Sequence, residues 1–209
     1  MDGTTMSRLH SRSKKAILMS RGRRLRGLAL PPLLAAVLGG CSSSGSGYVN
    51  PNVDFGHIRR VAVLPFENLT PDDLADERMH SVFLMELLEE DVLEVADPGE
   101  TVAAMRSLGL PVGSALSPDQ AVKLGAELRV EALIAGTIEE YGLSRVDRSR
   151  GPEVTAVFAM IETETGSMIW RSQVYANGAS TLKKLFGGGA SGMYEVSREA
   201  VRKALGTLL

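Results

Sequence analysis

Residues 57–73, which read HIRRVAVLPFENLTPDD, decide the fold of this 209-residue chain. Residues 61–64 are four strand-forming apolar residues, and Pro65 ends the strand because proline has no backbone N–H to donate. Thr70 is a suitable helix cap, and Pro71 then takes the first helical position. A buried strand that leads directly into a capped helix is typical of the start of an α/β domain.

The chain downstream continues to alternate between strands and helices. Asp97-Pro98 and Ser117-Pro118 each place a capping side chain before a helix-starting proline. Residues 154–161 are apolar on both faces, as in a central strand covered by helices. We expect a single α/β domain over residues 57–209, with a mixed β-sheet flanked by helices on both faces. The expected helices span residues 72–90, 98–108, 118–128 and 191–209, and the expected strands span residues 61–64, 92–95, 131–138, 154–161 and 167–176, the last with Met168, Trp170 and Val174 on one face.

The first 40 residues have the anatomy of an export signal. They carry eight Lys and Arg residues and one acid, followed by an apolar core over residues 28–38. This core is too short for a membrane-spanning helix, which needs about 20 apolar residues. We therefore expect residues 1–40 to be a signal peptide, and Met19 gives a more ordinary start for it than Met1.

A short motif at the end of this signal indicates lipidation. Leu38, Gly39, Gly40 and Cys41 resemble the bacterial lipobox, in which the chain is cut before a cysteine that carries acyl chains such as palmitate. Cys41 is the only cysteine in the chain, so it has no disulfide partner. Acyl chains on Cys41 would anchor the protein to a membrane. By the familiar sorting rule, Ser42 directs such a protein to the outer membrane, facing the periplasm.

A tether and an acidic domain follow the lipobox. Residues 41–56 are rich in Ser and Gly and predict a flexible tether, of which residues 42–56 span at most about 50 Å. Without the first 40 residues, 15 Lys and Arg remain against 24 Asp and Glu, which gives a charge of −9. An acidic domain without a long basic run argues against nucleic acid as a partner.

Two motifs carry a family resemblance. Residues 61–70, VAVLPFENLT, and residues 162–170, ETETGSMIW, resemble the opening strand and a later hairpin of a group of bacterial envelope proteins. The group includes the curli secretion lipoprotein CsgG, the amino-terminal domain of TolB and the penicillin-binding-protein activator LpoB. The resemblance implies an α/β fold like that of the TolB amino-terminal domain.

Candidate chemical sites are few. Residues 187–192 satisfy G-x-G-x-x-G but lack the following strand and acid of a dinucleotide site, so we interpret them as a loop. Residues 182–186, LKKLF, predict a solvated loop, with a membrane or subunit contact as the alternative. His80 follows Asp76 by one helical turn without an evident third metal ligand, and the adjacent acids Glu139-Glu140 point apart on a strand. No catalytic residue, cofactor site or metal site is predicted.

These observations predict a non-catalytic envelope lipoprotein. It would act as an accessory or assembly factor through contacts with envelope proteins, whose identity the sequence leaves open, and a homo-oligomer is compatible with the resemblance. The alternative is a subunit of a CsgG-like oligomeric secretion channel in the outer membrane. That function requires lipid-facing strands of about 9–11 residues, whereas residues 154–176 have the pattern of a core hairpin. An enzyme is the third hypothesis, for which no residue constellation is found.

Overall fold

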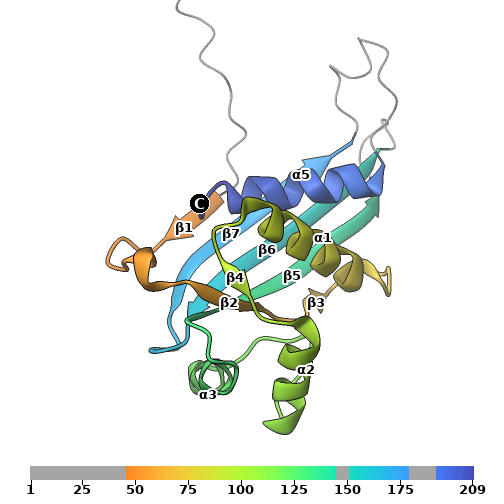
Figure 1. Ribbon diagram of the computed structural model, residues 1–209. Coiled ribbons are helices and arrows are strands. Elements are labelled where there is room, and N and C mark those ends of the chain that lie inside the picture. Colours follow the sequence, from red (N-terminus) through yellow and green to blue (C-terminus); the bar gives the residue numbers. More distant parts are fainter. Residues whose placement is uncertain (1–45, 145–150, 179–191) are drawn as a thin grey trace, which may run out of the picture. The chain divides into compact units, whose positions relative to one another are not determined.

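The computed structural model describes residues 46–144, 151–178 and 192–209 (Figure 1). Every described residue belongs to one compact unit, Ser42–Leu209. The elements are β1 (Ser46–Val49), the 3-10 turn η1 (Phe55–His57), β2 (Arg60–Val63), β3 (Glu67–Asn68), α1 (Ala75–Glu90), β4 (Glu94–Val95), α2 (Pro98–Ser107), α3 (Pro118–Leu128), β5 (Ala132–Leu143), β6 (Pro152–Glu162), β7 (Met168–Asn177) and α5 (Met193–Leu205).

These strands form one mixed sheet in the order β1-β7-β6-β5-β2-β4, with β3 beside β5. β2 is parallel to both β4 and β5. The neighbouring pairs β5 and β6, β6 and β7, and β7 and β1 are each antiparallel. The expected fold class is confirmed, because helices cover both faces of this sheet. The expected central strand, β6, lies between β5 and β7.

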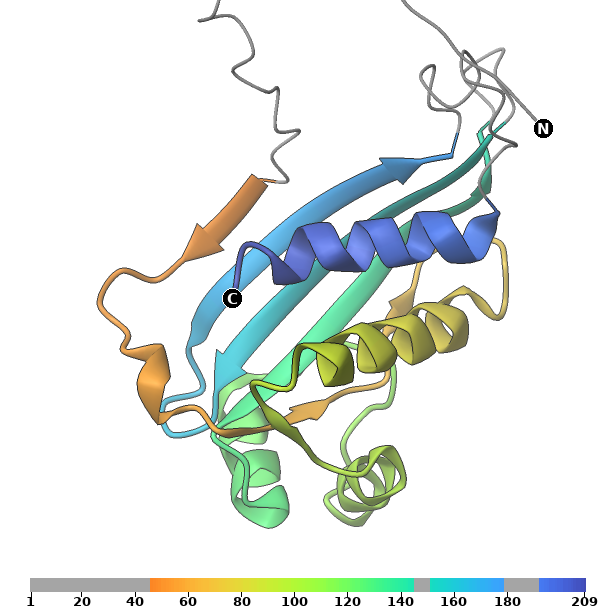
Figure 2. The same cartoon turned by 45° about the horizontal axis from the view of Figure 1, so that its top comes forward.

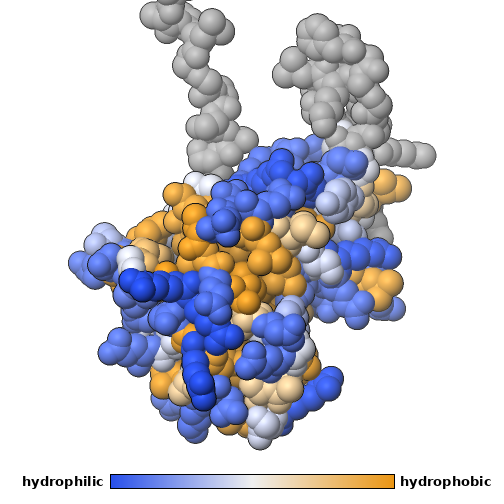
Figure 3. Space-filling model, viewed as in Figure 1, coloured by the Kyte–Doolittle hydropathy of each residue, from blue (hydrophilic) through white to orange (hydrophobic). Residues whose placement is uncertain are grey.

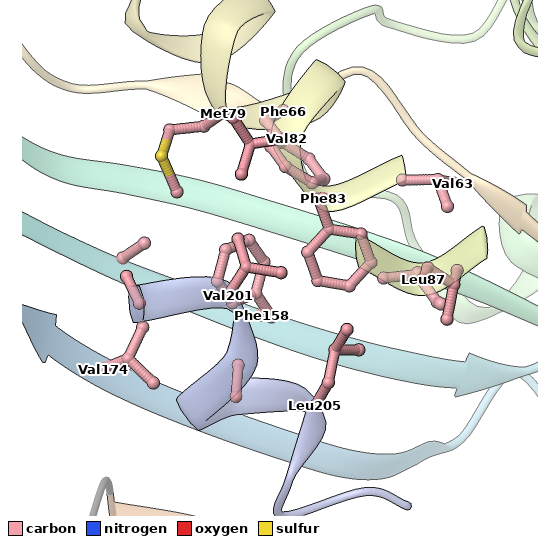
Figure 4. Close-up of a cluster of buried hydrophobic side chains, with 14 of the residues drawn as sticks. Val63, Phe66, Met79, Val82, Phe83, Leu87, Phe158, Val174, Val201 and Leu205 are labelled. Atoms are coloured by element: carbon pink, nitrogen blue, oxygen red, sulfur yellow. The ribbon is translucent and has the colours of Figure 1, made fainter. Parts of the chain in front are cut away.

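One face of the sheet carries α1 and α5, which lie side by side across it (Figure 2). Phe66, Phe83 and Phe158 form the centre of the core on this face, with ring centroids 4.8 to 5.6 Å apart. Aliphatic side chains of α1, α5 and the strands surround these rings (Figure 4). The residues labelled there are Val63, Phe66, Met79, Val82, Phe83, Leu87, Phe158, Val174, Val201 and Leu205.

The opposite face carries α2 and α3 over β2 and β5. Successive side chains of a strand point to opposite faces of the sheet, so β2 contributes to the packing on both faces. Val61 and Val63 point toward α1 and α5, and Ala62 belongs to the smaller cluster under α2 and α3. Because β2 is buried on both faces, it reads as an uninterrupted apolar run in the sequence.

The start of α1 differs from the prediction. α1 begins at Ala75 rather than at residue 72, and its N-cap, Leu74, makes no side-chain capping bond. Thr70 does not cap the helix; its Oγ1 instead accepts a hydrogen bond from Asp72 N at 3.2 Å, within a turn before the helix. Local turn hydrogen bonds of Ser and Thr compete with helix capping, and here the turn prevails.

The predicted tether is wrong for residues 46–49. These residues form β1, which pairs antiparallel with β7 in a register that places Tyr48 opposite Arg171. Gly47 lies against the end of the chain, where a Cβ on Gly47 would be 3.4 Å from the Cβ of Thr207. Ser and Gly composition predicted flexibility, but an open edge of β7 supplies backbone partners that composition does not reveal.

The face of Met168 was also predicted wrongly. Trp170 and Val174 are buried on the α1 and α5 face as expected, whereas Met168 is exposed. The pairing of β6 with β7 shifts register between Met160 and Ile161, so that Met160 pairs with Trp170 but Ile161 pairs with Met168. This β-bulge adds one residue to β7 and reverses the alternation of its faces.

Candidate functional site

The PFENLT motif forms the connection between the sheet and α1. Phe66 lies in the aromatic core, and its ring passes so close to Gly136 on β5 that a Cβ there would approach the ring to 2.6 Å. Asn68 donates from Nδ2 to the carbonyl of Asp72 at 2.8 Å and to Asp76 Oδ1 at 3.2 Å. The distinctive residues of the motif therefore fix the chain path from β2 into α1.

The ETETG motif has a similar role on the other side of the molecule. Thr163 Oγ1 donates to the carbonyl of Val130 at 2.6 Å, which ties the β6–β7 turn to the end of α3. Gly166 has φ +69°, and a Cβ there would lie 2.6 Å from the carbonyl oxygen of Pro118. The turn and the start of α3 approach so closely that only glycine fits at this position.

Trp170 completes the second motif. Its ring is buried, and its Nε1 donates to Thr207 Oγ1 at 3.1 Å, just beyond the end of α5. A buried indole N–H needs such a partner, and this bond fixes the C-terminal segment against β7. In the two motifs, the polar groups of Asn68, Thr163 and Trp170 are therefore all bound within the fold.

The half-buried His80 packs against the core in the described structure. Its ring lies 5.1 Å from that of Phe66 in an edge-on arrangement, and its Nε2 donates to the carbonyl of Val63 at 3.4 Å. Burial lowers the pKa of His80, although the Val63 carbonyl and Asp76 act in the opposite direction. Within the described ranges no group of three or more His, Cys, Asp or Glu side chains could hold a metal ion.

Glu139 and Glu140 both lie on the sheet face opposite α1 and α5. Glu139 accepts a hydrogen bond from Gln173 Nε2 at 3.3 Å, and Glu140 accepts one from Thr155 Oγ1 at 2.7 Å. The sequence predicted that these adjacent acids would point apart, but a bulge between Ile138 and Glu140 changes the alternation. Each carboxylate pairs with its own neighbour across the strands.

A charge network around the buried carboxylate of Glu86 joins α1 to α5. The carboxylate of Glu86 is nearly inaccessible and accepts hydrogen bonds from the guanidinium groups of Arg198 and Arg202. Glu89, which is half exposed, pairs with the same two arginines at 3.2 and 3.4 Å. Burial raises the pKa of Glu86, but the hydrogen bonds from the two arginines outweigh it and hold the pKa below its usual range.

A cavity of about 600 Å³ opens between the N-terminal halves of α1 and α5. The side chains that line it are Val82, Met85, Tyr141, Met193 and Tyr194, together with the polar residues Glu77, Arg78, Ser81 and Ser197. Exposed apolar side chains continue from it along α1 and the turn that follows, at Met85, Leu88 and Val92. Figure 3 shows an apolar area on the face where α1 and α5 lie.

One of the lining residues, Ser197, carries a buried polar atom. Ser197 is only 1% exposed, and among the described residues its Oγ has no hydrogen-bond partner. Buried hydroxyl groups in folded proteins are nearly always hydrogen-bonded. No local sequence pattern indicates this site, because its residues come from α1, β5 and α5 and meet only in the folded chain.

The residues predicted for processing lie outside the described residues. These are Leu38, Gly39, Gly40 and Cys41, and the same holds for the LKKLF segment at 182–186. Of the glycine-rich segment at 187–192, only Gly192 is described, as the N-cap of α5. In the described part of the chain, no helix has both the length and the apolar character needed to cross a membrane.

Comparisons with known proteins identify a fold and no family. The chain matches no protein-family description and no curated protein. The PelC dodecamer from Paraburkholderia phytofirmans is similar over 79% of this chain and 96% of that one, with 18% identity and a TM-score of 0.55. This likeness shows a shared fold.

Two further solved structures match at a TM-score of 0.46. Lipoprotein GNA1162 from Neisseria meningitidis shares 21% identity, over 62% of this chain and 90% of that chain. The C-terminal domain of LpoB from Salmonella enterica shares 13%, over 60% of this chain and 86% of that domain.

Proposed function

We propose that this chain is an envelope lipoprotein that is anchored through Cys41 and acts without catalysis, as an accessory or assembly factor. The observation that carries the proposal is the combination of a lipobox-like signal with a domain whose recognisable motifs serve the fold. The polar side chains of those motifs, such as Asn68 and Thr163, are bound within the domain. Such a domain works by the surface that it offers to other proteins.

The anchor rests on residues 38–41. The acyl chains on Cys41 would hold the domain at a membrane, and Ser42 favours the outer membrane with the domain in the periplasm. Because β1 begins at Ser46, only four residues separate Cys41 from the folded part. The domain would therefore work close to the membrane surface.

Self-assembly is the second part of the proposal. PelC, which shares this fold, forms a dodecamer. We infer that this chain also forms a homo-oligomer, and that its envelope partners bind the assembly. Among the described residues, no observation favours the alternative of a CsgG-like channel subunit.

The test is lipid labelling combined with a measurement of native mass. Cells expressing the wild-type chain, Cys41→Ala or Ser42→Asp are grown with an alkyne analogue of palmitate, and the protein is then extracted in mild detergent. We expect label on the wild type and Ser42→Asp but none on Cys41→Ala, with Ser42→Asp moved to the inner-membrane fraction. Native mass spectrometry should find an oligomer of one chain type.

Three outcomes would count against the proposal. Labelling of Cys41→Ala would disprove Cys41 as the lipid anchor. A monomer at every concentration would disprove the proposed self-assembly. Ion conductance of the purified oligomer in planar bilayers would replace the accessory function with that of a channel.

A further inference from the structure

We propose that a second pocket, on the sheet face that carries α2 and α3, binds a small zwitterionic amino acid between Glu67 and Arg171. The ammonium group of the ligand would pair with the carboxylate of Glu67, and its carboxylate would pair with the guanidinium group of Arg171. This inference goes beyond the proposed function, since it does not depend on Cys41 or on the oligomeric state.

The pocket lies where the cover of α2 and α3 over the sheet ends. The hydrophobic cluster under these helices includes no residue of β7 in the described structure. The strand residues that line the pocket alternate with the core residues Ile134, Ile138 and Phe158, so they point away from α1 and α5. They are Ala135 and Thr137 of β5, Val157, Ala159 and Ile161 of β6, and Met168 and Arg171 of β7. Residues 64–65 and 114–116 complete the lining with Glu67 and Gly136.

The described lining contains one acid and one base. The half-buried Glu67 accepts a hydrogen bond from Thr137 Oγ1 at 3.0 Å, and it forms no ion pair in the described part of the chain. Among the described residues, the side chain of Arg171 has neither an ion pair nor a hydrogen bond. A partly buried carboxylate favours a cationic partner, and a guanidinium group binds a carboxylate through two parallel hydrogen bonds. The pocket therefore presents one unpaired charge of each sign.

The sheet keeps these two charges apart. Glu67 lies on β3 beside Thr137 of β5, whereas Arg171 lies on β7, with β6 between β5 and β7. Neighbouring strands are about 4.8 Å apart, so three spacings place the backbones of β3 and β7 about 14 Å apart. Both side chains line the pocket, and no ion pair joins them. A ligand that carries both charges can pair with both, whereas a ligand with a single charge leaves one of them without a partner.

The volume of the pocket limits the ligand to a small molecule. It is about 170 Å³, which is below the range of about 300–1,000 Å³ that is usual for larger ligands. Since a water molecule occupies about 30 Å³ in the liquid, the pocket has room for about six waters or a ligand of similar size. Alanine is of this size, and its methyl group would lie against Leu116, Val157 or Ile161. A longer peptide exceeds this volume.

The other polar groups of the pocket add no further requirement. Thr137 already donates to Glu67, and Ser114 is exposed and can bond to water. The backbone groups of β5 and β6 are engaged in pairing the two strands. The remaining lining side chains are apolar. Recognition therefore depends on two opposite charges and a short apolar contact, which are the features of an amino acid with a small apolar side chain.

Isothermal titration calorimetry of the full chain in mild detergent tests this inference. The probe is alanine, used as the L and as the D enantiomer. Propionate and ethylamine are matched probes, because propionate lacks the ammonium group of alanine and ethylamine lacks its carboxylate. We expect at least one enantiomer of alanine to bind saturably, and both matched probes to bind at least tenfold more weakly.

Two variants assign the charges. Glu67→Gln keeps the shape of the side chain and can still accept from Thr137, and it should bind alanine no better than propionate. Arg171→Met keeps an apolar stem but removes the charge, and it should bind alanine no better than ethylamine. Glu139→Gln is the matched control, because Glu139 lies on the same sheet face but does not line the pocket, and it should bind alanine like the wild type.

The absence of saturable binding for both enantiomers would overturn the site, and equal affinity of the wild type for alanine and propionate would overturn the zwitterion. Unchanged affinity for alanine in both Glu67→Gln and Arg171→Met would show that alanine binds elsewhere. An equal loss in Glu139→Gln and Glu67→Gln would show a general effect of charge on this face instead. Because these readouts are affinities for a soluble ligand, they are independent of the tests of Cys41 and of the oligomer.

Discussion

Gly136 illustrates how one residue decides the packing of another. Its missing side chain leaves room for the ring of Phe66, whose nearest atom would lie 2.6 Å from a Cβ at this position. We predict that Gly136→Ala lowers the free energy of unfolding by about 2 kcal/mol, because a methyl group inserted into a packed core displaces its neighbours. Urea denaturation followed by circular dichroism measures this change.

Gly47→Ala is the control for this prediction. Gly47 is also a strand glycine, but its added Cβ would make only an ordinary contact of 3.4 Å with Thr207. We expect a change below about 0.5 kcal/mol at this site. The close approach at Gly136 is disproved as the cause if both variants unfold at the same urea concentration, or if Phe66→Leu does not restore part of the loss in Gly136→Ala.

Glu86 links the stability of the protein to pH. Its folded-state pKa lies below the ordinary value of 4.5, so its pairing with Arg198 and Arg202 stabilises the fold fully above about pH 4.5. This contribution is lost as the pH falls through the lowered pKa. We predict that Glu86→Gln costs about 1 to 2 kcal/mol at pH 7, because it weakens two charge-assisted hydrogen bonds while Glu89 still pairs with both arginines.

Denaturation curves of the wild type and Glu86→Gln between pH 7 and pH 3 check this prediction. The difference between the two should be constant down to about pH 4.5 and should shrink below it. Glu89→Gln provides the control, since this half-exposed acid touches the same arginines. A difference that grows as the pH falls would contradict the assignment, as would an equal effect of both variants.

At the scale of elements, the turn between β6 and β7 is held against the start of α3. Gly166 and Gly109 both have positive φ, at 69° and 65°, but a Cβ at Gly166 would strike Pro118 whereas one at Gly109 would meet nothing within 4 Å. We predict that Gly109→Ala costs about 1 kcal/mol for the left-handed backbone alone. Gly166→Ala should cost about 2 kcal/mol more, because the turn must move away from the helix.

Thermal unfolding of the two variants separates backbone strain from packing. Hydrogen exchange should also show faster exchange of α3 amides in Gly166→Ala and unchanged exchange in Gly109→Ala. Equal losses of stability in both would mean that the contact between Gly166 and Pro118 contributes nothing.

Local sequence signals predicted helix starts well where the cap is a self-contained motif. Ser117 and Gln120 form the reciprocal bonds of a capping box, and Asp97 caps α2 through the backbone N–H of Glu100. Thr70 failed as a cap because Asn68 engages it: Asn68 Oδ1 accepts from both the backbone N–H and the hydroxyl of Thr70. The side chain of Asn68, two residues before Thr70, therefore prevents the capping, and the sequence patterns used to predict helix starts do not consider that position.

At the scale of the whole molecule, β1 brings the beginning of the folded part next to its end. The expected Cβ separation of 3.4 Å between positions 47 and 207 is close to the 3.5–4.5 Å usual for disulfides. We predict that Gly47→Cys with Thr207→Cys, in a Cys41→Ala background, forms a disulfide under mild oxidation. A mobility shift on non-reducing electrophoresis, reversed by a reductant, detects it.

Tyr48→Cys with Thr207→Cys is the matched control. Neighbouring residues on a strand point to opposite faces, so this pair should remain reduced. If both pairs oxidise to the same extent, residues 46–49 behave as the flexible tether that their composition suggested. The oxidised pair at 47 and 207 should also raise the free energy of unfolding by about 2 to 4 kcal/mol.

Of the two candidate sites at residues 38–41 and between α1 and α5, one is a local sequence motif and the other is formed only by the tertiary structure. The lipobox at residues 38–41 is a contiguous motif that an enzyme reads in an extended chain, so the sequence can predict it and the folded domain adds nothing to it. The cavity between α1 and α5 has no local signal. Met85, Tyr141 and Ser197 meet only because α1 and α5 pack side by side on β5 and β6.

Local sequence patterns predicted most of the helices and strands of this protein and the layers in which they pack. Apolar periods of two and 3.6 residues, proline stops and self-contained caps are local properties, and they are enough to predict an α/β domain with helices on both faces of a mixed sheet. The tertiary structure alone decided the β1 pairing, the bulge that exposes Met168 and the buried hydroxyl of Ser197. Each of these depends on partners that are distant in the chain, so its energy arises only when those partners meet.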